Sequence, residues 1–170
     1  MGEVLAYWMR WPSVENFFLQ TTGSWALFET FHFIGLALLV GIVGMFDLRI
    51  LGMAKRVPVA PLAELLPWAV LGFVLAVVTG LGFVTGLKAN LYDADPYNVL
   101  MTDVYLQLKL IFIGLAGLNL LFFYASGMQR VVYALGPGED APGLAKFIAG
   151  TSLTLWIGVV WMGRMVPWGL

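Results

Sequence analysis

Long runs of apolar residues divide this chain into four blocks separated by short polar stretches. The blocks cover about residues 25–51, 61–88, 103–124 and 144–168. Each block is long enough for one crossing, since a helix needs about 20 predominantly apolar residues to span the ~30 Å hydrocarbon layer of a bilayer. The pattern therefore predicts an all-α integral membrane protein, a bundle of four transmembrane helices that forms a single domain over residues 1–170.

The segment before the first block has a different pattern, because aromatic and charged residues are mixed over residues 3–20. Trp11 follows Arg10 directly, and Pro12 then interrupts the segment. Such a mixture is typical of an amphipathic segment that lies at the membrane surface. We expect residues 3–20 to lie in the interface, and we expect Ser24 to cap the first spanning helix.

Small residues recur in the blocks at spacings that allow helices to approach closely. They are Gly35, Gly41 and Gly44 in the first block, and Gly72, Ala76, Gly80, Gly82 and Gly86 in the second. These residues predict tight helix packing. Because four short spans enclose little interior, we also expect a homo-oligomer, a dimer or trimer, with the second span near its interface.

Composition changes this picture mainly by exclusion. The chain is 61% hydrophobic and only 11% charged, which leaves too little polar surface for a soluble domain. It has no cysteine, which excludes disulfides, a thiolate metal site and covalent attachment of a c-type haem. The formal net charge of −1 gives no reason to expect nucleic acid as a partner.

The distribution of basic residues predicts the orientation in the membrane. Lysine and arginine gather beside the first and third connections, at Arg49, Lys55, Arg56, Arg130 and Lys146. The opposite side carries Arg10 and Lys88. By the positive-inside rule these two connections lie in the cytoplasm. We expect a multi-pass protein of the bacterial inner membrane with both termini in the periplasm.

Several ionisable residues of the apolar blocks gather in the half of the bilayer near the termini. His32 is the single histidine, and Glu29 lies three residues before it, about one helical turn away. Lys109 lies in the third block, Arg164 near the end of the fourth, and Lys88 at the end of the second. Ionisable groups inside membrane helices are costly and mark candidate functional sites.

This layer carries more cations than carboxylates, and something should compensate the excess. Asp103 is one candidate partner, Lys88 can extend to the membrane surface, and an anionic ligand is the third possibility. A b-type haem meets this need, because it brings two propionates and an iron that accepts histidine. We expect His32 to be the axial ligand with help from Glu29, and Lys109 and Arg164 to hold the propionates together with Lys88. Met162 is a candidate second ligand. The alternative is a copper or zinc ion bound by His32 and Glu29.

The leading hypothesis is therefore a membrane-embedded redox protein that transfers electrons to a partner protein or a quinone. No nucleophile–base pair points to catalysis. Two alternatives remain: a small transporter or channel that uses Glu29 and His32 as a proton relay, and a structural subunit of a larger complex, in which these ionisable groups only neutralise one another. We expect Asp103, at the start of the third block, to cap a helix.

The chain also resembles a family of small, four-helix bacterial membrane proteins of unknown function. The resemblance is carried by ETFHFIGLALLVG and FDLRILG at residues 29–41 and 46–52, LLPWAVLGFVLAVVTGLGFV at 65–84, QLKLIFIGLAGLNLLFF at 107–123, and Arg164. It implies the four-span topology and carries no activity with it. A more distant likeness is to copper-resistance membrane proteins of the CopD kind, in bundle style and histidine-bearing spans.

Overall fold

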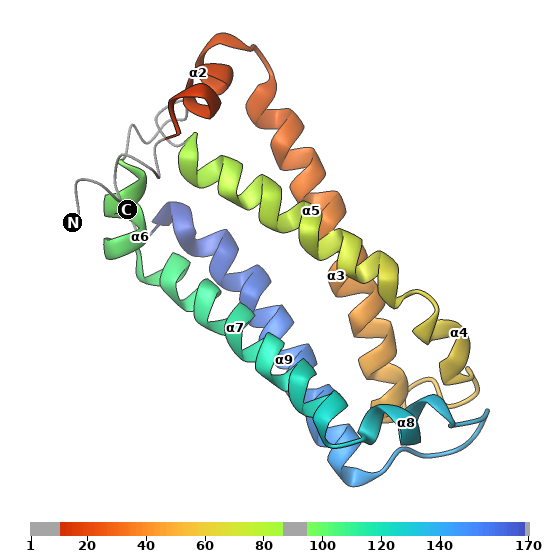
Figure 1. The fold of residues 1–170 in the computed structure, drawn as a ribbon. Helices are drawn as coiled ribbons and strands as arrows, with labels where there is room; N and C mark the ends of the chain where they lie inside the picture. The colour runs from red at the N-terminus through yellow and green to blue at the C-terminus, as the bar shows by residue number, and fades with distance from the viewer. Residues whose placement is uncertain (1–10, 87–94, 169–170) are drawn as a thin grey trace.

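The structure, a computed structural model, describes residues 11–86 and 95–168, and every regular element in these ranges is a helix (Figure 1). The helices are α2 (Pro12–Gln20), α3 (Ser24–Leu51), α4 (Val59–Ala63), α5 (Leu66–Thr85), α6 (Pro96–Thr102), α7 (Val104–Ala125), α8 (Met128–Tyr133), α9 (Gly143–Met165) and the 3-10 turn η2 (Val166–Trp168). Lys88 and the beginning of the predicted interfacial segment lie outside the described residues.

Four helical stretches are long and apolar enough to cross a membrane, which confirms the predicted all-α, four-span fold class. They are Ser24–Leu51, Val59–Thr85, Val104–Ala125 and Gly143–Trp168. The second stretch is broken into α4 and α5 rather than continuous. Pro67 lies in the first turn of α5, where its missing N–H and its ring end the preceding helix.

The start of α3 differs from the prediction. Ser24 is the first helical residue, and Gly23, with φ of 83°, occupies the cap position. The Ser24 hydroxyl donates instead to the Phe18 carbonyl oxygen at 3.3 Å, which ties α3 to α2. Asp103 does cap α7, because its Oδ1 accepts from the Leu106 N–H at 2.8 Å.

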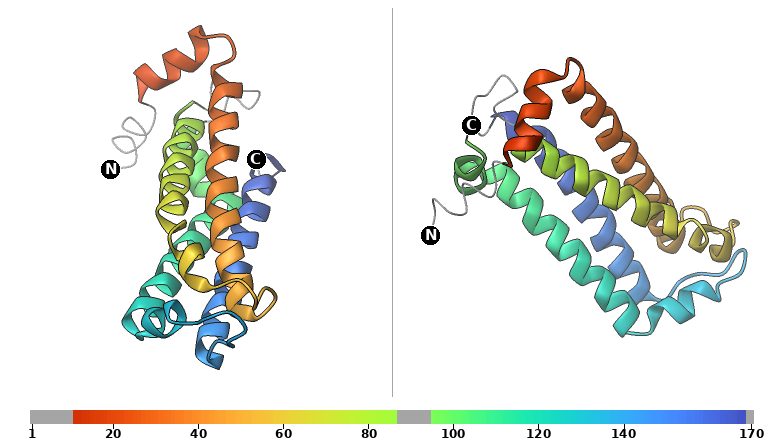
Figure 2. Two further views of the ribbon diagram at one scale, coloured as in Figure 1. Left: turned by 90° about the vertical axis from the view of Figure 1, so that its right-hand side faces the viewer. Right: turned by 45° about the horizontal axis from the view of Figure 1, so that its top comes forward.

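The four long helices pack as two hairpins. The first hairpin consists of α3 and α5, the second of α7 and α9, and α3 packing against α9 is the main contact that joins them (Figures 1 and 2). Helices α4 and α8 lie at one end of the bundle, and α2 and α6 at the other. Because α5 and α7 pack on their hairpin partners and not extensively on each other, space is left between the hairpins.

Two glycines bring the helices of the first hairpin into close contact. A Cβ on Gly35 would lie 2.8 Å from the Gly72 carbonyl oxygen, and a Cβ on Gly72 would lie 2.7 Å from the Gly35 carbonyl oxygen. Only backbone fits here, so this pair fixes where α3 crosses α5. Gly41 has open space around its Cα and takes no part in the crossing.

An aromatic cluster closes the first hairpin at the α2–α6 end. It consists of Phe17, Phe18, Trp25, Phe28 and Phe83, whose rings contact one another at centroid distances of 4.7 to 6.3 Å. Gly82 and Gly86 make room for it, since side chains at these positions would collide with the Phe28 and Phe18 rings. These two glycines therefore admit rings from the same chain.

The α4–α8 end is held together by Arg49, which is fully buried near the end of α3. Its guanidinium donates to the Val57 carbonyl of the first connection and to the Gly136 and Glu139 carbonyls of the third. Asp140 accepts from Lys146 and pairs with Lys55 on the surface above it. The first and third connections thus lie at one end of the bundle, as an up-and-down topology requires.

Candidate functional site

His32 lies in the α2–α6 half of the bundle, where its side chain is 8% exposed. It projects from α3 toward α5, and its Nδ1 is 2.8 Å from the hydroxyl oxygen of Thr79. The Phe83 ring packs edge-on against the imidazole at a centroid distance of 5.3 Å. The aromatic cluster lies between His32 and the α2–α6 end of the bundle, so it separates His32 from water at that end.

The hydrogen bonds of Thr79 determine which imidazole nitrogen carries the proton. The Thr79 hydroxyl oxygen is 2.7 Å from the Leu75 carbonyl oxygen, and two oxygens at that distance need a proton between them. The hydroxyl therefore donates to Leu75, so Nδ1 of His32 must donate to Thr79. This assignment leaves Nε2 with its lone pair, the state in which histidine binds a metal.

Lys109 of α7 brings a positive charge close to this imidazole. The two groups are near enough to interact electrostatically. The lysine side chain lies over Gly163 of α9, with Nζ 3.2 Å from the position that a Cβ on Gly163 would occupy. Lys109 makes no ion pair among the residues that the structure describes. Its charge therefore lacks a partner from this part of the chain, as the prediction of an anionic ligand requires.

The other predicted site residues differ from His32 in their exposure. Glu29 is exposed although it is only three residues from His32, so it lies on the outer edge of α3. Arg164 is exposed and follows Gly163 directly, while Met162 is half-buried on α9. Lys88 is outside the described residues. The structure thus brings His32 and Lys109 together and leaves Glu29 and Arg164 at the surface of the bundle.

A metal ion held by several side chains finds no support. Within residues 11–86 and 95–168 there is no group of three or more histidine, cysteine, aspartate or glutamate side chains that are placed to hold one. The donor set at His32 is one imidazole with a nearby cation. Such a set suits a cofactor that brings most of its own metal ligands.

Two polar residues with clear structural roles were missed by the sequence argument. Thr79 orients His32 through a hydrogen bond. The sequence feature that could have identified Thr79 is its hydroxyl within a largely apolar helix. Asp47 is 5% exposed on α3 in the α4–α8 half, and its Oδ2 is buried without a hydrogen-bond partner in the described structure. Its signal was plain: it is a carboxylate inside an apolar membrane helix.

Comparison with known protein families, with curated proteins and with solved structures finds no match for this chain. The interpretation of the site therefore rests on its geometry.

Proposed function

We propose that the protein is a membrane-embedded redox protein that binds a b-type haem through Nε2 of His32. The observation that carries the proposal is the buried imidazole whose Nδ1 donates to Thr79 while its Nε2 keeps a lone pair. A histidine that ligates a metal almost always donates its other ring N–H to an acceptor, which fixes the tautomer and the ring orientation.

The donor set favours haem over a copper or zinc ion. In the part of the chain that the structure describes, His32 belongs to no group of three or more ligating side chains, so its donor set is too small for a tightly bound ion. The same imidazole suffices for haem, because the porphyrin nitrogens supply the other ligands in its plane. Lys109 has no anionic partner in the described part of the chain and is suited to a propionate. Arg164, which is exposed and follows Gly163, would assist.

A bound haem would supply reversible one-electron chemistry. The chain's own residues then set the conditions for it. Thr79 holds the imidazole and keeps its Nε2 available, and the aromatic cluster limits access of water. Lys109 stabilises negative charge near the site, which favours the reduced state. Electrons would pass to or from a redox protein or a quinone at the membrane surface.

The first test is the absorption spectrum of protein purified from iron-replete cells. We expect a Soret band that shifts on reduction, and we expect His32→Ala to lose it while the helical circular dichroism remains. Glu29→Gln is the matched control, because it alters an ionisable side chain on the same helix that is exposed. It should keep the band. A colourless wild-type preparation without iron would overturn the proposal.

The alternative of a proton relay through Glu29 and His32 has less support. A relay needs the two groups in contact or joined by water, whereas Glu29 is exposed and His32 is buried toward α5. No observation favours the third hypothesis, a structural subunit, over either of these.

We further propose that the protein lies in a bacterial inner membrane with both termini in the periplasm. Support comes from the basic residues beside the first and third connections, which share one end of the bundle (Figure 1). The chain has no cysteine, so single cysteines can be introduced cleanly. A membrane-impermeant thiol reagent applied from outside should label Asp93→Cys and not Arg56→Cys. Labelling of Arg56→Cys alone would reverse the orientation.

We also retain the proposal of a homo-oligomer, a dimer or trimer, although the expected surface changes. Gly72 and Ala76 of the second span are buried against α3 of the same chain. Helix α7 is the least enclosed of the four spans, and its outer face is the surface left for a second copy. Mass measurement in mild detergent should give a multiple of the 18.7 kDa chain, and a monodisperse monomer would contradict this.

A further inference from the structure

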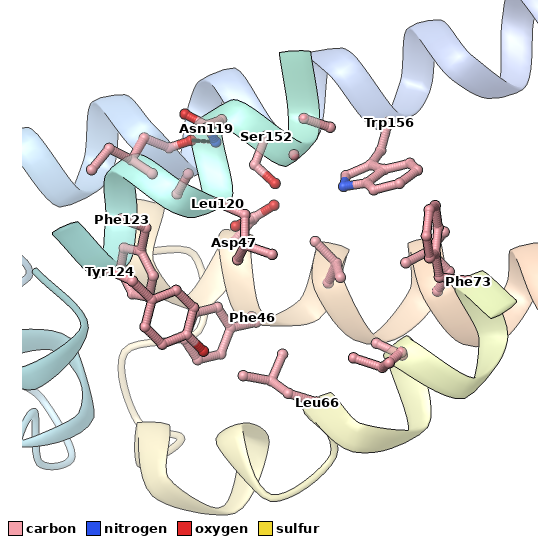
Figure 3. Close-up of a pocket in the computed structure, with 18 of the residues that line it drawn as sticks. Phe46, Asp47, Leu66, Phe73, Asn119, Leu120, Phe123, Tyr124, Ser152 and Trp156 are labelled. Atoms are coloured by element: carbon pink, nitrogen blue, oxygen red, sulfur yellow. Dashed lines mark hydrogen bonds between the residues drawn. The ribbon is translucent and has the colours of Figure 1, made fainter. Parts of the chain in front are cut away.

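A cavity lies between the two hairpins in the α4–α8 half of the bundle, away from His32 (Figure 3). Its volume is about 280 Å³, close to the lower end of the ~300–1,000 Å³ that is usual for small-molecule sites. All four long helices contribute to its wall, which is mainly aliphatic and aromatic. The aromatic side chains that line it are Phe46, Phe73, Phe123, Tyr124 and Trp156.

Asp47 is the only charged residue among those that line this cavity. It projects from α3 toward α9, where the Ser152 hydroxyl lies beside it (Figure 3). Its Oδ2 is buried and has no hydrogen-bond partner in the described structure. A carboxylate in such a place is costly unless a donor or a positive charge completes it.

The polar side chains that line the cavity with Asp47 are Asn119, Tyr124, Ser152 and Trp156. Asn119 donates one amide N–H to the Ile148 carbonyl at 3.0 Å, and its Oδ1 remains an acceptor. The Ser152 hydroxyl is beside the carboxylate. The Tyr124 hydroxyl and the indole N–H of Trp156 also line the cavity, and the indole ring offers a π-face. Acceptors inside a ring of aromatic faces fit a cation that carries N–H donors.

The rim of the cavity faces the bilayer between α5 and α7. Val70 on α5 and Leu120 on α7 line the cavity, and yet they are 62% and 56% exposed on the outer surface of the bundle. Because these two helices make few contacts with each other and their cavity-lining residues are exposed, we infer that a ligand enters between them from the lipid. A ligand that enters this way must itself be largely apolar.

We propose that this cavity binds a small lipophilic amine in its protonated form, with the ammonium N–H donating to Oδ2 of Asp47 and the apolar part packing against the aromatic wall. The site lies on the same helix as His32, in the opposite half of the bundle, and does not depend on haem.

The proposal is tested by ligand-induced thermal stabilisation and calorimetry on the full-length protein in detergent. The probe is phenethylamine, compared with phenethyl alcohol of the same shape and with the trimethylammonium derivative of the amine. We expect saturable binding of the amine. We expect binding at least about tenfold weaker for the alcohol, which has no charge, and for the trimethylammonium ion, which has no N–H.

Variants separate charge recognition from general loss of structure. Asp47→Asn should weaken amine binding at least about tenfold, and Asp47→Glu should restore part of it. Glu29→Gln is the matched control, since it removes a carboxylate from the exposed face of α3, and it should bind the amine like wild type. His32→Ala should do so as well. Helical circular dichroism and melting temperature without ligand establish that each variant is folded.

Three results would overturn the proposal. They are equal affinity for the amine and the alcohol, wild-type affinity in folded Asp47→Asn, and absence of saturable amine binding by the wild type.

Discussion

His32 and Asp47 lie on the same helix, α3, but the surroundings of their side chains differ. From residue 32 to residue 47 the separation along α3 is roughly 22 Å at 1.5 Å per residue. His32 packs against the Phe83 ring and donates to Thr79, so its position and tautomer are fixed. Asp47 faces a cavity, with one oxygen unpartnered. The His32 side chain is fixed by its neighbours, whereas the Asp47 carboxylate has an oxygen without a partner in the described structure.

Lys109 and Asp47 lie in different halves and differ in sign, whereas Asp103, which caps α7 in the His32 half, also has a buried Oδ2 without a hydrogen-bond partner in the described structure. Lys109, near His32, is a cation without a carboxylate, and Asp47 is a carboxylate without a cation, within the part of the chain that the structure describes. Neither can neutralise the other, because they lie at different depths in different hairpins. An anionic group in one half and a cationic ligand in the other would satisfy both.

The largest effect is expected from Arg49→Ala, which should disturb the Asp47 half alone. Arg49 is fully buried two residues beyond Asp47, and its removal leaves three connection carbonyls without their donor. We expect a loss of about 3 kcal/mol or more in unfolding free energy, together with weaker amine binding.

Thermal unfolding and phenethylamine titration check this prediction, with Arg56→Ala as the control because Arg56 is exposed on the same connection. Soret absorbance per folded protein should change little. If Arg49→Ala lost haem and kept amine binding, the two halves would not be separable in the way described.

A smaller effect is expected from Gly35→Ala, which should disturb the His32 half. A Cβ at this position would lie 2.8 Å from the Gly72 backbone, so α3 and α5 must move apart. The His32–Thr79 hydrogen bond joins the same two helices. We expect about 1–3 kcal/mol of destabilisation and reduced haem retention.

Gly41→Ala is the matched control for this substitution, because nothing lies within 4 Å of the added methyl group. It should be neutral or more stable by up to about 1 kcal/mol, since alanine favours helix over glycine. Equal melting temperatures for the two variants would show that the close crossing contributes nothing to the position of His32.

A more local effect is expected from Thr79→Val, which keeps the side-chain shape and removes the acceptor of the Nδ1 proton. Haem retention should fall by about tenfold, because the ring loses the partner that orients it. Thr85→Val is the control, since the Thr85 hydroxyl bonds only to carbonyls of its own helix. Haem titration into apoprotein measures both. Identical curves for the two variants would remove Thr79 from the site.

The smallest effect is expected from Asp140→Asn, at the surface of the α4–α8 end. Hydrogen bonds from Lys146 and Lys55 hold the pKa of the Asp140 carboxyl below its usual value. A lowered carboxyl pKa stabilises the fold above the unfolded value of 3.8, and this contribution is lost as the pH falls through the folded value. The melting temperature of Asp140→Asn should therefore lie slightly below wild type at neutral pH and converge with it in acid.

The number of spans and their approximate ends could be predicted because the bilayer imposes length and apolarity on each helix. The directions of the side chains could not. A membrane helix is apolar on all sides, so its sequence does not show which face meets a neighbour. Glu29 and His32 are close in sequence, but the α3–α5 crossing buries only His32. The residue that caps a helix could not be predicted either, since Gly23 and not Ser24 occupies the cap position of α3.

The depth of the candidate site could be predicted by counting residues along the spanning helices, but its surroundings could not. Counting residues placed His32 and Lys109 at one depth, and in the structure Lys109 lies within electrostatic range of His32. Asp47 lies in the FDLRILG segment, which contributed only to the family resemblance. Its importance depends on a cavity that four helices form. Such a cavity has no signature in any one segment of the chain.

One crossed measurement tests the separation of the two sites most directly. Haem absorbance and phenethylamine binding are measured on the wild type, His32→Ala, Asp47→Asn and the double variant, all in the same detergent. We predict that His32→Ala loses the Soret band and keeps amine binding, that Asp47→Asn does the reverse, and that the double variant loses both. Loss of both properties in either single variant, or loss of neither, would contradict two independent sites on α3.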